Sequence, residues 1–77
     1  MNGLGVFTWP DGNQYIGQYL NDKRHGKGIL KKANGDRFEG MWKDDVEDGL
    51  GEIIYANGDK KKIGKWENGT IILWIAE

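Results

Sequence analysis

Two stretches of the chain decide its fold: YIGQYLNDKRHGKG at residues 15–28 and FEGMWKDDVEDGLG at residues 38–51. They align without a gap at a spacing of 23 residues. Each opens with the pattern aromatic-x-Gly-x-aromatic and closes with Gly-x-Gly. A fixed period of this length indicates a repeat architecture, in which each unit stacks on its neighbours.

The same period extends beyond these two stretches. Three sets of glycines keep it: Gly3, Gly26 and Gly49; Gly5, Gly28 and Gly51; and Gly12, Gly35 and Gly58. One residue is inserted within residues 60–62, after which the spacing becomes 24, as between Trp42 and Trp66. We therefore predict one domain over residues 1–77, with a partial unit, two full units, a truncated unit and a terminating strand at residues 1–13, 14–36, 37–59, 60–69 and 70–76.

Within each unit, residues of one kind recur at every second position, which is the period of a strand. Tyr15, Gly17 and Tyr19 fall on one face of such a strand, and Gln18 falls on the other. One face of the predicted sheet is therefore aromatic and the other mostly polar, as in a half-exposed antiparallel sheet. The 13 glycines and the lack of a 3.6-residue period argue against helices.

Turn residues separate these alternating segments. Asp-Gly or Asn-Gly pairs occur within residues 10–13, 33–36 and 56–59, and both residues of such a pair tolerate positive φ. A further tight turn is expected at residues 67–70. The prediction is all-β: a single twisted antiparallel sheet of tandem hairpins, a short solenoid-like array, with strands near residues 5–9, 14–20, 28–32, 37–43, 51–55, 61–66 and 70–75.

Glycine inside a strand normally weakens it and marks a bulge, a bend or a close approach. Here Gly17 lies between Tyr15 and Tyr19, and Gly40 lies between Phe38 and Trp42. We expect the missing side chain to leave room for an aromatic ring from the next strand.

Composition narrows the possible functions. The chain carries 11 basic and 12 acidic residues, a net charge of −1, which argues against a strongly basic nucleic-acid-binding domain. It has no cysteine, so disulfides and thiolate metal sites are excluded. A chain this small buries only about 60% of its unfolded surface, so its stability must come from aromatic packing or from another chain. The apolar run at residues 71–76 is too short to span a bilayer, and no secretory leader is recognised, so we expect a cytoplasmic protein.

The repeated residues resemble the MORN (membrane occupation and recognition nexus) repeat family. Its motif, roughly Tyr-x-Gly-x-Trp, a short polar loop and Gly-x-Gly, matches residues 15–28 and 38–51, with residues 21–25 as the first loop. Two departures are that the first unit begins halfway and that Lys61 or Lys62 replaces the leading aromatic of the third. Members named by this resemblance include junctional membrane proteins, plant phosphoinositide kinases, a histone methyltransferase and ciliary spoke proteins. The resemblance implies a repeat that binds or positions, in a cytoskeletal, ciliary or membrane-associated setting, while any chemistry lies in other domains.

The sequence gives little support for catalysis or metal binding. His25 is the single histidine, and we expect it to be a loop residue and not a general base. The acidic cluster Asp44, Asp45, Glu47 and Asp48 lacks the spacing of a calcium loop, which favours a solvated charged loop. Strands and not helices follow the Gly-x-Gly pairs, so a phosphate loop is disfavoured. We predict no catalytic residue, no metal and no cofactor.

Protein binding is the main functional prediction. An aromatic face with glycine gaps offers anchor residues of the kind that interfaces favour: Tyr15, Tyr19, Phe38, Trp42 and Trp66. The alternative is that these rings form the core, and a single-layer sheet allows some of both. The chain's uncharged last strand is a second candidate, a docking edge for a partner protein or a second copy through Ile71, Leu73, Trp74 and Ile75. A competing arrangement folds this strand back over the aromatic face.

Two alternatives remain open at this stage. Equivalent turns of a stacked array share one edge, where a basic strip could meet an anionic phospholipid: Lys31, Lys32, Arg37, Lys60, Lys61 and Lys62. The competing interpretation is an edge kept soluble by lysine. The chain could also be the repeat segment of a larger enzyme.

Overall fold

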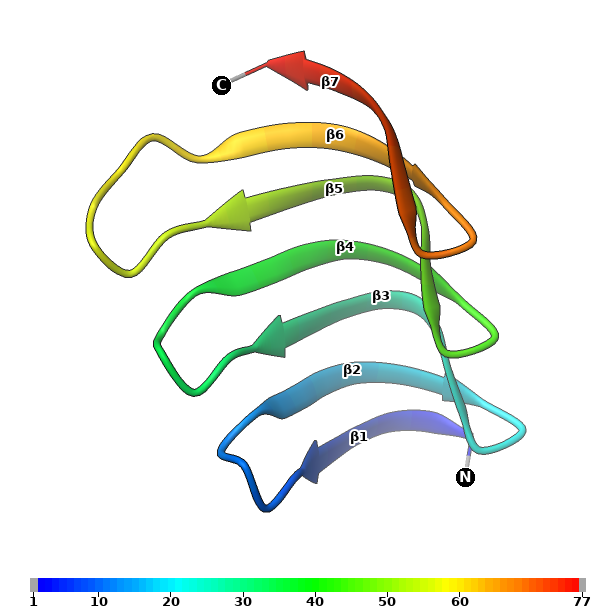
Figure 1. Cartoon of the computed structure of the whole chain (residues 1–77). Coiled ribbons are helices and arrows are strands. Elements are labelled where there is room, and N and C mark those ends of the chain that lie inside the picture. The colour runs from blue at the N-terminus through cyan, green and yellow to red at the C-terminus, as the bar shows by residue number, and fades with distance from the viewer. Residues whose placement is uncertain (1, 77) are drawn as a thin grey trace.

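The computed structural model describes residues 2–76, which form a single antiparallel sheet (Figure 1). Within these residues the sheet has seven strands in sequence order: β1 Gly3–Thr8, β2 Gln14–Leu20, β3 Lys23–Lys31, β4 Arg37–Lys43, β5 Val46–Ile54, β6 Lys62–Glu67 and β7 Thr70–Ala76. Each strand pairs antiparallel with the next, so hairpins stack side by side and β1 and β7 form the two edges (Figure 1). The predicted all-β hairpin array is confirmed.

The turns before β3 and β5 are shorter than predicted. β3 begins at Lys23 and β5 at Val46, each five residues earlier than expected. Four residues of these turns have positive φ: Asn21 (52°), Asp22 (66°), Asp44 (49°) and Asp45 (71°). Asn and Asp tolerate this left-handed conformation and can therefore close a two-residue hairpin without glycine.

These short turns correct two expectations about loops. The predicted polar loop at residues 21–25 is wrong, because His25 lies within β3. The predicted acidic loop is also wrong: Asp44 and Asp45 form the turn, whereas Glu47 and Asp48 belong to β5.

The hairpin loops at the other end of the sheet follow one pattern. In the first, Gly12 N–H donates to the Trp9 carbonyl at 3.0 Å, and Asn13 N–H donates to Asp11 Oδ1 at 3.0 Å. Gly12 has a φ of 96°, and the equivalent Gly35 has a φ of 94°. The predicted turns are present, but glycine alone of each pair takes positive φ, while the preceding Asp or Asn holds the turn with its side chain.

Successive loops at this end are joined to one another. Asn13 Oδ1 accepts a hydrogen bond of 2.9 Å from Ala33 N–H, and Asp36 Oδ1 accepts one of 2.9 Å from Ala56 N–H. Asn13 and Asp36 occupy the same place in successive repeats. One side chain per repeat therefore links its loop to the next.

A row of facing glycines crosses the sheet from β1 to β6: Gly5, Gly17, Gly28, Gly40, Gly51 and Gly64. A Cβ on Gly28 would lie 2.5 Å from Cε1 of Tyr15, and one on Gly51 would lie 2.5 Å from Cε1 of Phe38. Room for a ring from a neighbouring strand is therefore present at Gly28 and Gly51, and not at Gly17 and Gly40, for which it was expected. At Gly17 the nearest atom is instead Cα of Gly28, at 2.5 Å, so a side chain there would strike the backbone of β3.

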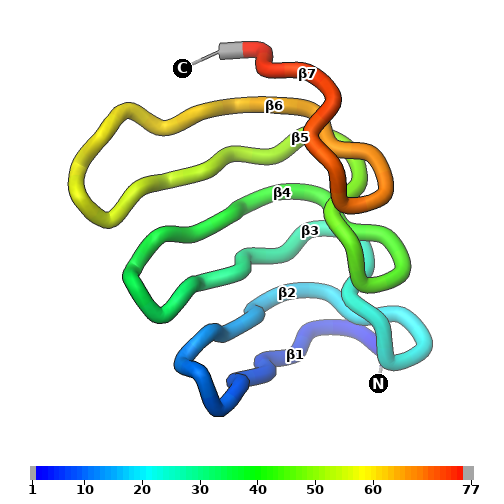
Figure 2. Tube along the Cα trace, viewed as in Figure 1, coloured from blue at the N-terminus to red at the C-terminus, as the bar shows by residue number. Residues whose placement is uncertain are grey.

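The long strands β3 and β5 each bend at a bulge. Tyr19 pairs with Arg24 and not with Gly26, which has a φ of 78°. The same shift recurs in β5, where Gly49 has a φ of 110°. The first part of each strand consequently runs at a steep angle to the rest (Figure 2). This bend brings Arg24 onto the aromatic rings of the sheet.

Candidate binding surfaces

The aromatic face is a continuous chain of edge-to-face ring contacts. Its successive centroid distances are 5.2 Å for Tyr19–Tyr15, 5.3 Å for Tyr15–Trp42, 5.5 Å for Trp42–Phe38, 4.8 Å for Phe38–Trp66 and 5.8 Å for Trp66–Trp74. Each such contact adds about 0.5–1.5 kcal/mol beyond the burial of apolar area. The rings therefore tie the repeats together in one direction across the sheet.

Four of the five aromatic residues predicted to bind a partner form the core instead: Tyr15, Phe38, Trp42 and Trp66. Their side chains are at most 6% exposed. Tyr19 packs against this cluster but stays partly exposed. Of the five, Tyr19 is therefore the ring that a partner reaches most easily.

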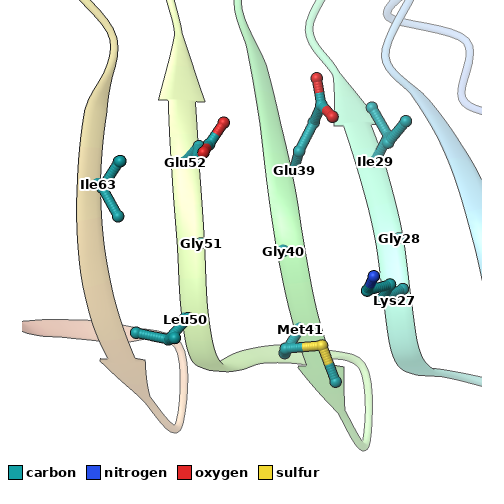
Figure 3. A pocket seen from close by; sticks show the side chains of 10 residues that line it. All are labelled: Lys27, Gly28, Ile29, Glu39, Gly40, Met41, Leu50, Gly51, Glu52 and Ile63. Carbon is teal, nitrogen blue, oxygen red and sulfur yellow. The ribbon is translucent and has the colours of Figure 1, made fainter.

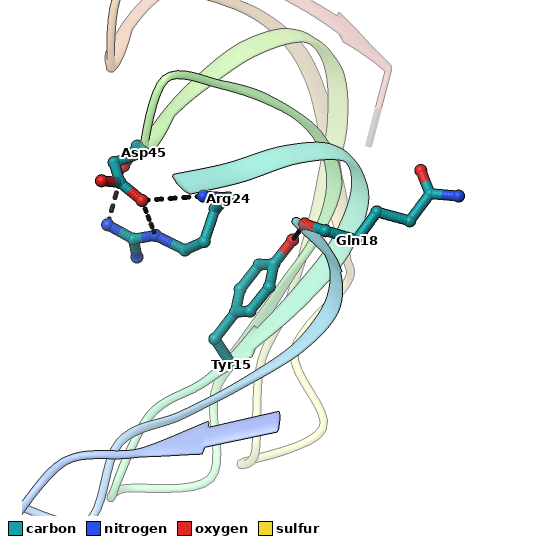
Figure 4. A network of polar contacts seen from close by, with 4 residues as sticks. All are labelled: Tyr15, Gln18, Arg24 and Asp45. Atoms are coloured by element: carbon teal, nitrogen blue, oxygen red, sulfur yellow. Dashed lines mark hydrogen bonds and ion pairs between the residues drawn. The ribbon is translucent and has the colours of Figure 1, made fainter. Parts of the chain in front are cut away.

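The buried Tyr15 hydroxyl is held by a single backbone contact. It donates a hydrogen bond of 2.9 Å to the Gln18 carbonyl (Figure 4). Burial, followed by the neighbouring Tyr19, raises the pKa of Tyr15 to about 12. Burial likewise raises the pKa of Tyr19.

Arg24, which belongs to the first full repeat at residues 14–36, lies over three aromatic rings. Its guanidinium carbon is 4.8 Å from the ring centroid of Trp42, 5.6 Å from that of Trp9 and 5.8 Å from that of Tyr15. Nε lies 3.3 Å from Asp45 Oδ1, and Nη2 donates to the Asp45 carbonyl at 2.7 Å (Figure 4). The Arg24 side chain is only 22% exposed. A cation over several rings, held by a carboxylate, is a strong local interaction.

One repeat further along the same face lies an unfilled pocket of about 320 Å³. We call it the second-repeat pocket; its lining includes Lys32, Phe38, Glu47, Tyr55 and Trp66. It combines aromatic walls with two carboxylates, Asp36 and Glu47, and two cations, Lys32 and Arg37.

The opposite face carries a larger, shallow groove of about 650 Å³ (Figure 3). Gly28, Gly40 and Gly51 form its floor. Figure 3 shows that both sides of this glycine row mix charged and apolar side chains: Glu39 and Glu52 with Ile29 and Ile63 on one side, and Lys27 with Met41 and Leu50 on the other. Both carboxylates are partly neutralised, because Glu39 lies 3.0 Å from Arg37 and Glu52 lies 3.7 Å from Lys61.

The opposite face is less polar than the sequence suggests. Leu4, Val6 and Leu50 are 81%, 58% and 58% exposed. They lie on that face because each neighbours a strand glycine that belongs to the aromatic face. Alternation identified the buried face correctly, but it underestimated the apolar content of the other.

The last strand, β7, pairs with β6 as the edge of the sheet and does not fold back over the aromatic face. Ile71 packs against the core, and Trp74 contacts Trp66. Four consecutive large side chains are nevertheless about half exposed: Ile72 (51%), Leu73 (57%), Trp74 (47%) and Ile75 (52%). We call these four residues the β7 strip.

The six basic residues predicted to bind lipid lie at the loop end of the sheet, in or beside the loops that join β3 to β4 and β5 to β6: Lys31, Lys32, Arg37, Lys60, Lys61 and Lys62 (Figure 1). Three of them have partners within the chain. Arg37 pairs with Glu39 and Lys61 with Glu52, while Lys62 Nζ lies 5.3 Å from the Trp74 ring centroid. The structure thus places all six at one end of the sheet, and three of them interact with other residues of the chain.

The acidic residues near the other end serve hydrogen bonds between turns. Asp45 holds Arg24, and Asp48 Oδ2 accepts from Asn68 N–H at 3.4 Å. Residues 2–76 contain no group of three or more His, Asp or Glu side chains placed to hold a metal ion. Nor does this part of the chain contain a helix long and apolar enough to cross a membrane.

Sequence reasoning missed Arg24 and Glu47 as a related pair. A signal was present: a shift of 23 residues places Glu47 where Arg24 stands in the preceding repeat, which reverses the charge at one position of the unit. The consequence needed the structure, because only the bend of β3 shows that this position faces the aromatic rings.

Comparison with known families agrees with this architecture. The MORN repeat model matches residues 1–14, 15–37 and 38–60, each ending one residue after the unit read from the sequence. No curated protein matches the chain. Three successive matches span most of the 77 residues and coincide with the stacked hairpins. The chain therefore belongs to the MORN repeat family.

Proposed function

We propose that this chain is a non-catalytic binding module that docks on a partner protein through the β7 strip. The observation that supports this is the exposure of four consecutive apolar side chains, residues 72–75. Residues 70–76 carry no charge that would keep this edge hydrated. Covering the strip would remove apolar surface from water, which favours association by roughly 25 cal/mol per Å² before the costs of binding.

The geometry of β7 favours contact through side chains over addition of a further strand. The β6–β7 register shifts twice, between Ile63 and Gly64 and between Lys65 and Trp66. Bulges interrupt the regular row of hydrogen-bonding groups that an incoming strand needs, and natural edges use them for protection. The proposed partner therefore presents an apolar surface to Leu73, Trp74 and Ile75.

The test is capture of partners from cells that express the protein. We compare the wild-type chain with a Leu73→Lys, Ile75→Lys variant, and we expect the variant to lose the specific partners. The matched control is Leu4→Lys, Val6→Lys, which adds the same charge to two exposed apolar residues of β1 at the other edge. Circular dichroism and melting curves confirm that all three proteins are folded.

Sedimentation of the purified chain separates a second copy from another protein as the partner. Equal capture by the wild type and the β7 variant would contradict docking through the strip. Loss of capture in the β1 control alone would move the binding surface to the other edge.

A further inference from the structure

Successive repeats build the same position around the aromatic rings with different residues. In the first repeat Arg24 lies over Trp9, Tyr15 and Trp42. A shift of 23 residues, or 24 after the insertion, converts these four residues into Glu47, Lys32, Phe38 and Trp66. All four of the shifted residues line the second-repeat pocket. The pocket is thus the second copy of the Arg24 position.

The second copy lacks the side chain that fills the first. Glutamate is shorter than arginine and carries the opposite charge, so Glu47 places a carboxylate where the first repeat has a guanidinium. Phe38 and Trp66 stand edge to face, 4.8 Å apart, and provide the walls. The backbone of Glu47 is fixed, because its carbonyl accepts a hydrogen bond of 2.8 Å from Gly69 N–H.

Beyond this pocket, Trp74 of β7 is the last ring of the aromatic ladder. Trp74 packs edge to face on Trp66 at 5.8 Å, and Lys62 Nζ lies 5.3 Å from the Trp74 ring centroid. The described part of the chain therefore fills the position before the pocket with Arg24 and closes the ladder after it with Trp74. The second-repeat pocket lies between them and stays open.

We infer that the second-repeat pocket binds an arginine side chain of the partner protein. An arginine guanidinium is planar, stacks on aromatic faces and pairs with a carboxylate. Arg24 does this in its own surroundings: it lies over Trp42, its Nε contacts the Asp45 carboxylate, and its Nη2 donates to the Asp45 carbonyl. The charges lining the pocket leave Glu47 for this role: Arg37 is paired with Glu39, and Asp36 Oδ1 already accepts from Ala56 N–H. Lys32 is exposed and stands where the first copy has the ring of Trp9, so the aromatic walls here are Phe38 and Trp66.

This inference rests on the proposed function for its ligand, but it concerns a different site. The β7 strip supplies an apolar contact surface for the partner, whereas the pocket recognises one basic side chain. A variant at the β7 strip should therefore lose docking without losing arginine binding, and a variant at the pocket should do the reverse.

The experiment is a titration of the ¹⁵N-labelled chain with acetyl-arginine amide, followed by nuclear magnetic resonance at the indole N–H groups. We expect a saturable shift of the Trp66 signal and no shift of the Trp42 signal, because Arg24 already occupies that position. Acetyl-lysine amide, which cannot stack as a plane, should bind more weakly.

Two variants of Glu47 make the test decisive, and the β7 variant serves as the control. Glu47→Gln keeps the shape of the side chain and should weaken binding on the order of tenfold, as loss of a charge-assisted contact does. Glu47→Arg copies the first repeat and should abolish binding by filling the pocket. The Leu73→Lys, Ile75→Lys variant should bind the probe like the wild type even when it loses its partner. An unmoved Trp66 signal, or equal affinity in wild type and Glu47→Gln, would overturn the inference.

Discussion

At the scale of single residues, glycine sets how closely the aromatic rings approach the neighbouring strand. Tyr15 lies across Gly28, and Phe38 lies across Gly51, at distances that leave no space for a methyl group. The 23-residue spacing of these glycines therefore follows from the equal spacing of the rings that pack against them.

Adding that methyl group is the first test. We expect Gly28→Ala and Gly51→Ala each to lower the free energy of unfolding by about 1–3 kcal/mol, because the Cβ would displace a buried ring. Urea unfolding measures the change. Gly58→Asn is the matched control: Gly58 has a φ of 86° with no atom within 4 Å of an added Cβ, and Asn tolerates that conformation. A control as unstable as Gly28→Ala would refute the packing argument.

The second residue-scale prediction concerns pH. Because the pKa of Tyr15 rises from 10.0 to about 12, the folded chain keeps this proton where the unfolded chain releases it. The stabilisation is complete below pH 10 and is lost as the pH rises toward 12. Tyr15→Phe should therefore melt with a smaller decline between pH 10 and 12 than the wild type does. Tyr55→Phe, which leaves Tyr15 intact, should decline like the wild type. Parallel curves for all three proteins would rule out this origin.

At the scale of elements, the sequence predicts a strand best where alternation and turn residues coincide. β2 and β4 have the predicted bounds, since an Asp-Gly or Asn-Gly turn precedes each and alternation runs through both. β3 and β5 start earlier than predicted, because residues 21–22 and 44–45 turn the chain without glycine. Alternation also fails at Gly26 and Gly49, where a bulge shifts the register.

The candidate sites were harder to predict than the fold. Periodicity places Tyr15 and Trp42 on one face but cannot tell a core ring from an exposed anchor in a single-layer sheet. The answer depends on how far β3 bends, which Gly26 sets through its backbone and not through any side chain. The β7 strip, by contrast, was predicted in large part from its uncharged sequence: Leu73, Trp74 and Ile75 are exposed as expected, whereas Ile71 packs on the core and Ile72 is exposed in its place.

The loop-to-loop hydrogen bonds give an element-scale prediction. Asp36 accepts a hydrogen bond from Ala56 N–H of the next loop, whereas Asp59, the equivalent residue one repeat later, forms hydrogen bonds with Asn57 of its own loop. Asp36→Ala should therefore cost about 0.5–1.5 kcal/mol more than Asp59→Ala. Hydrogen exchange at Ala56 should also speed up in Asp36→Ala alone. Equal stability and equal exchange in the two variants would show that the loops stack without this link.

At the scale of the whole molecule, the single layer explains why so little is buried. The described chain measures 34 × 25 × 16 Å, and its buried hydrophobic core consists of four aromatic side chains. Each repeat contacts its neighbours alone, as in other repeat arrays. The small core leaves apolar side chains on both the β7 edge and the opposite face, which a binding module can use.

Charge distribution favours a protein over an anionic membrane as the proposed ligand. Asp36 and Asp59 lie in the same loops as the basic residues of the loop end, and Asp11 lies in the equivalent loop between β1 and β2. The chain as a whole carries a net charge of −1. Arg37 and Lys61 are further offset by Glu39 and Glu52. A basic residue near an anionic surface contributes about 1 kcal/mol, and a carboxylate beside it opposes that attraction.

We therefore expect the chain to associate with phosphatidylserine vesicles only at low ionic strength and to be released at physiological salt, where surface charges are screened beyond about 8 Å. Replacing Lys60, Lys61 and Lys62 with Gln should abolish the weak association without altering the melting temperature. The matched control changes three exposed lysines away from this end, Lys23, Lys43 and Lys65, and should retain it. Co-sedimentation with vesicles measures both. Retention that survives physiological salt and is lost only in the first variant would favour a membrane surface as the ligand over a protein.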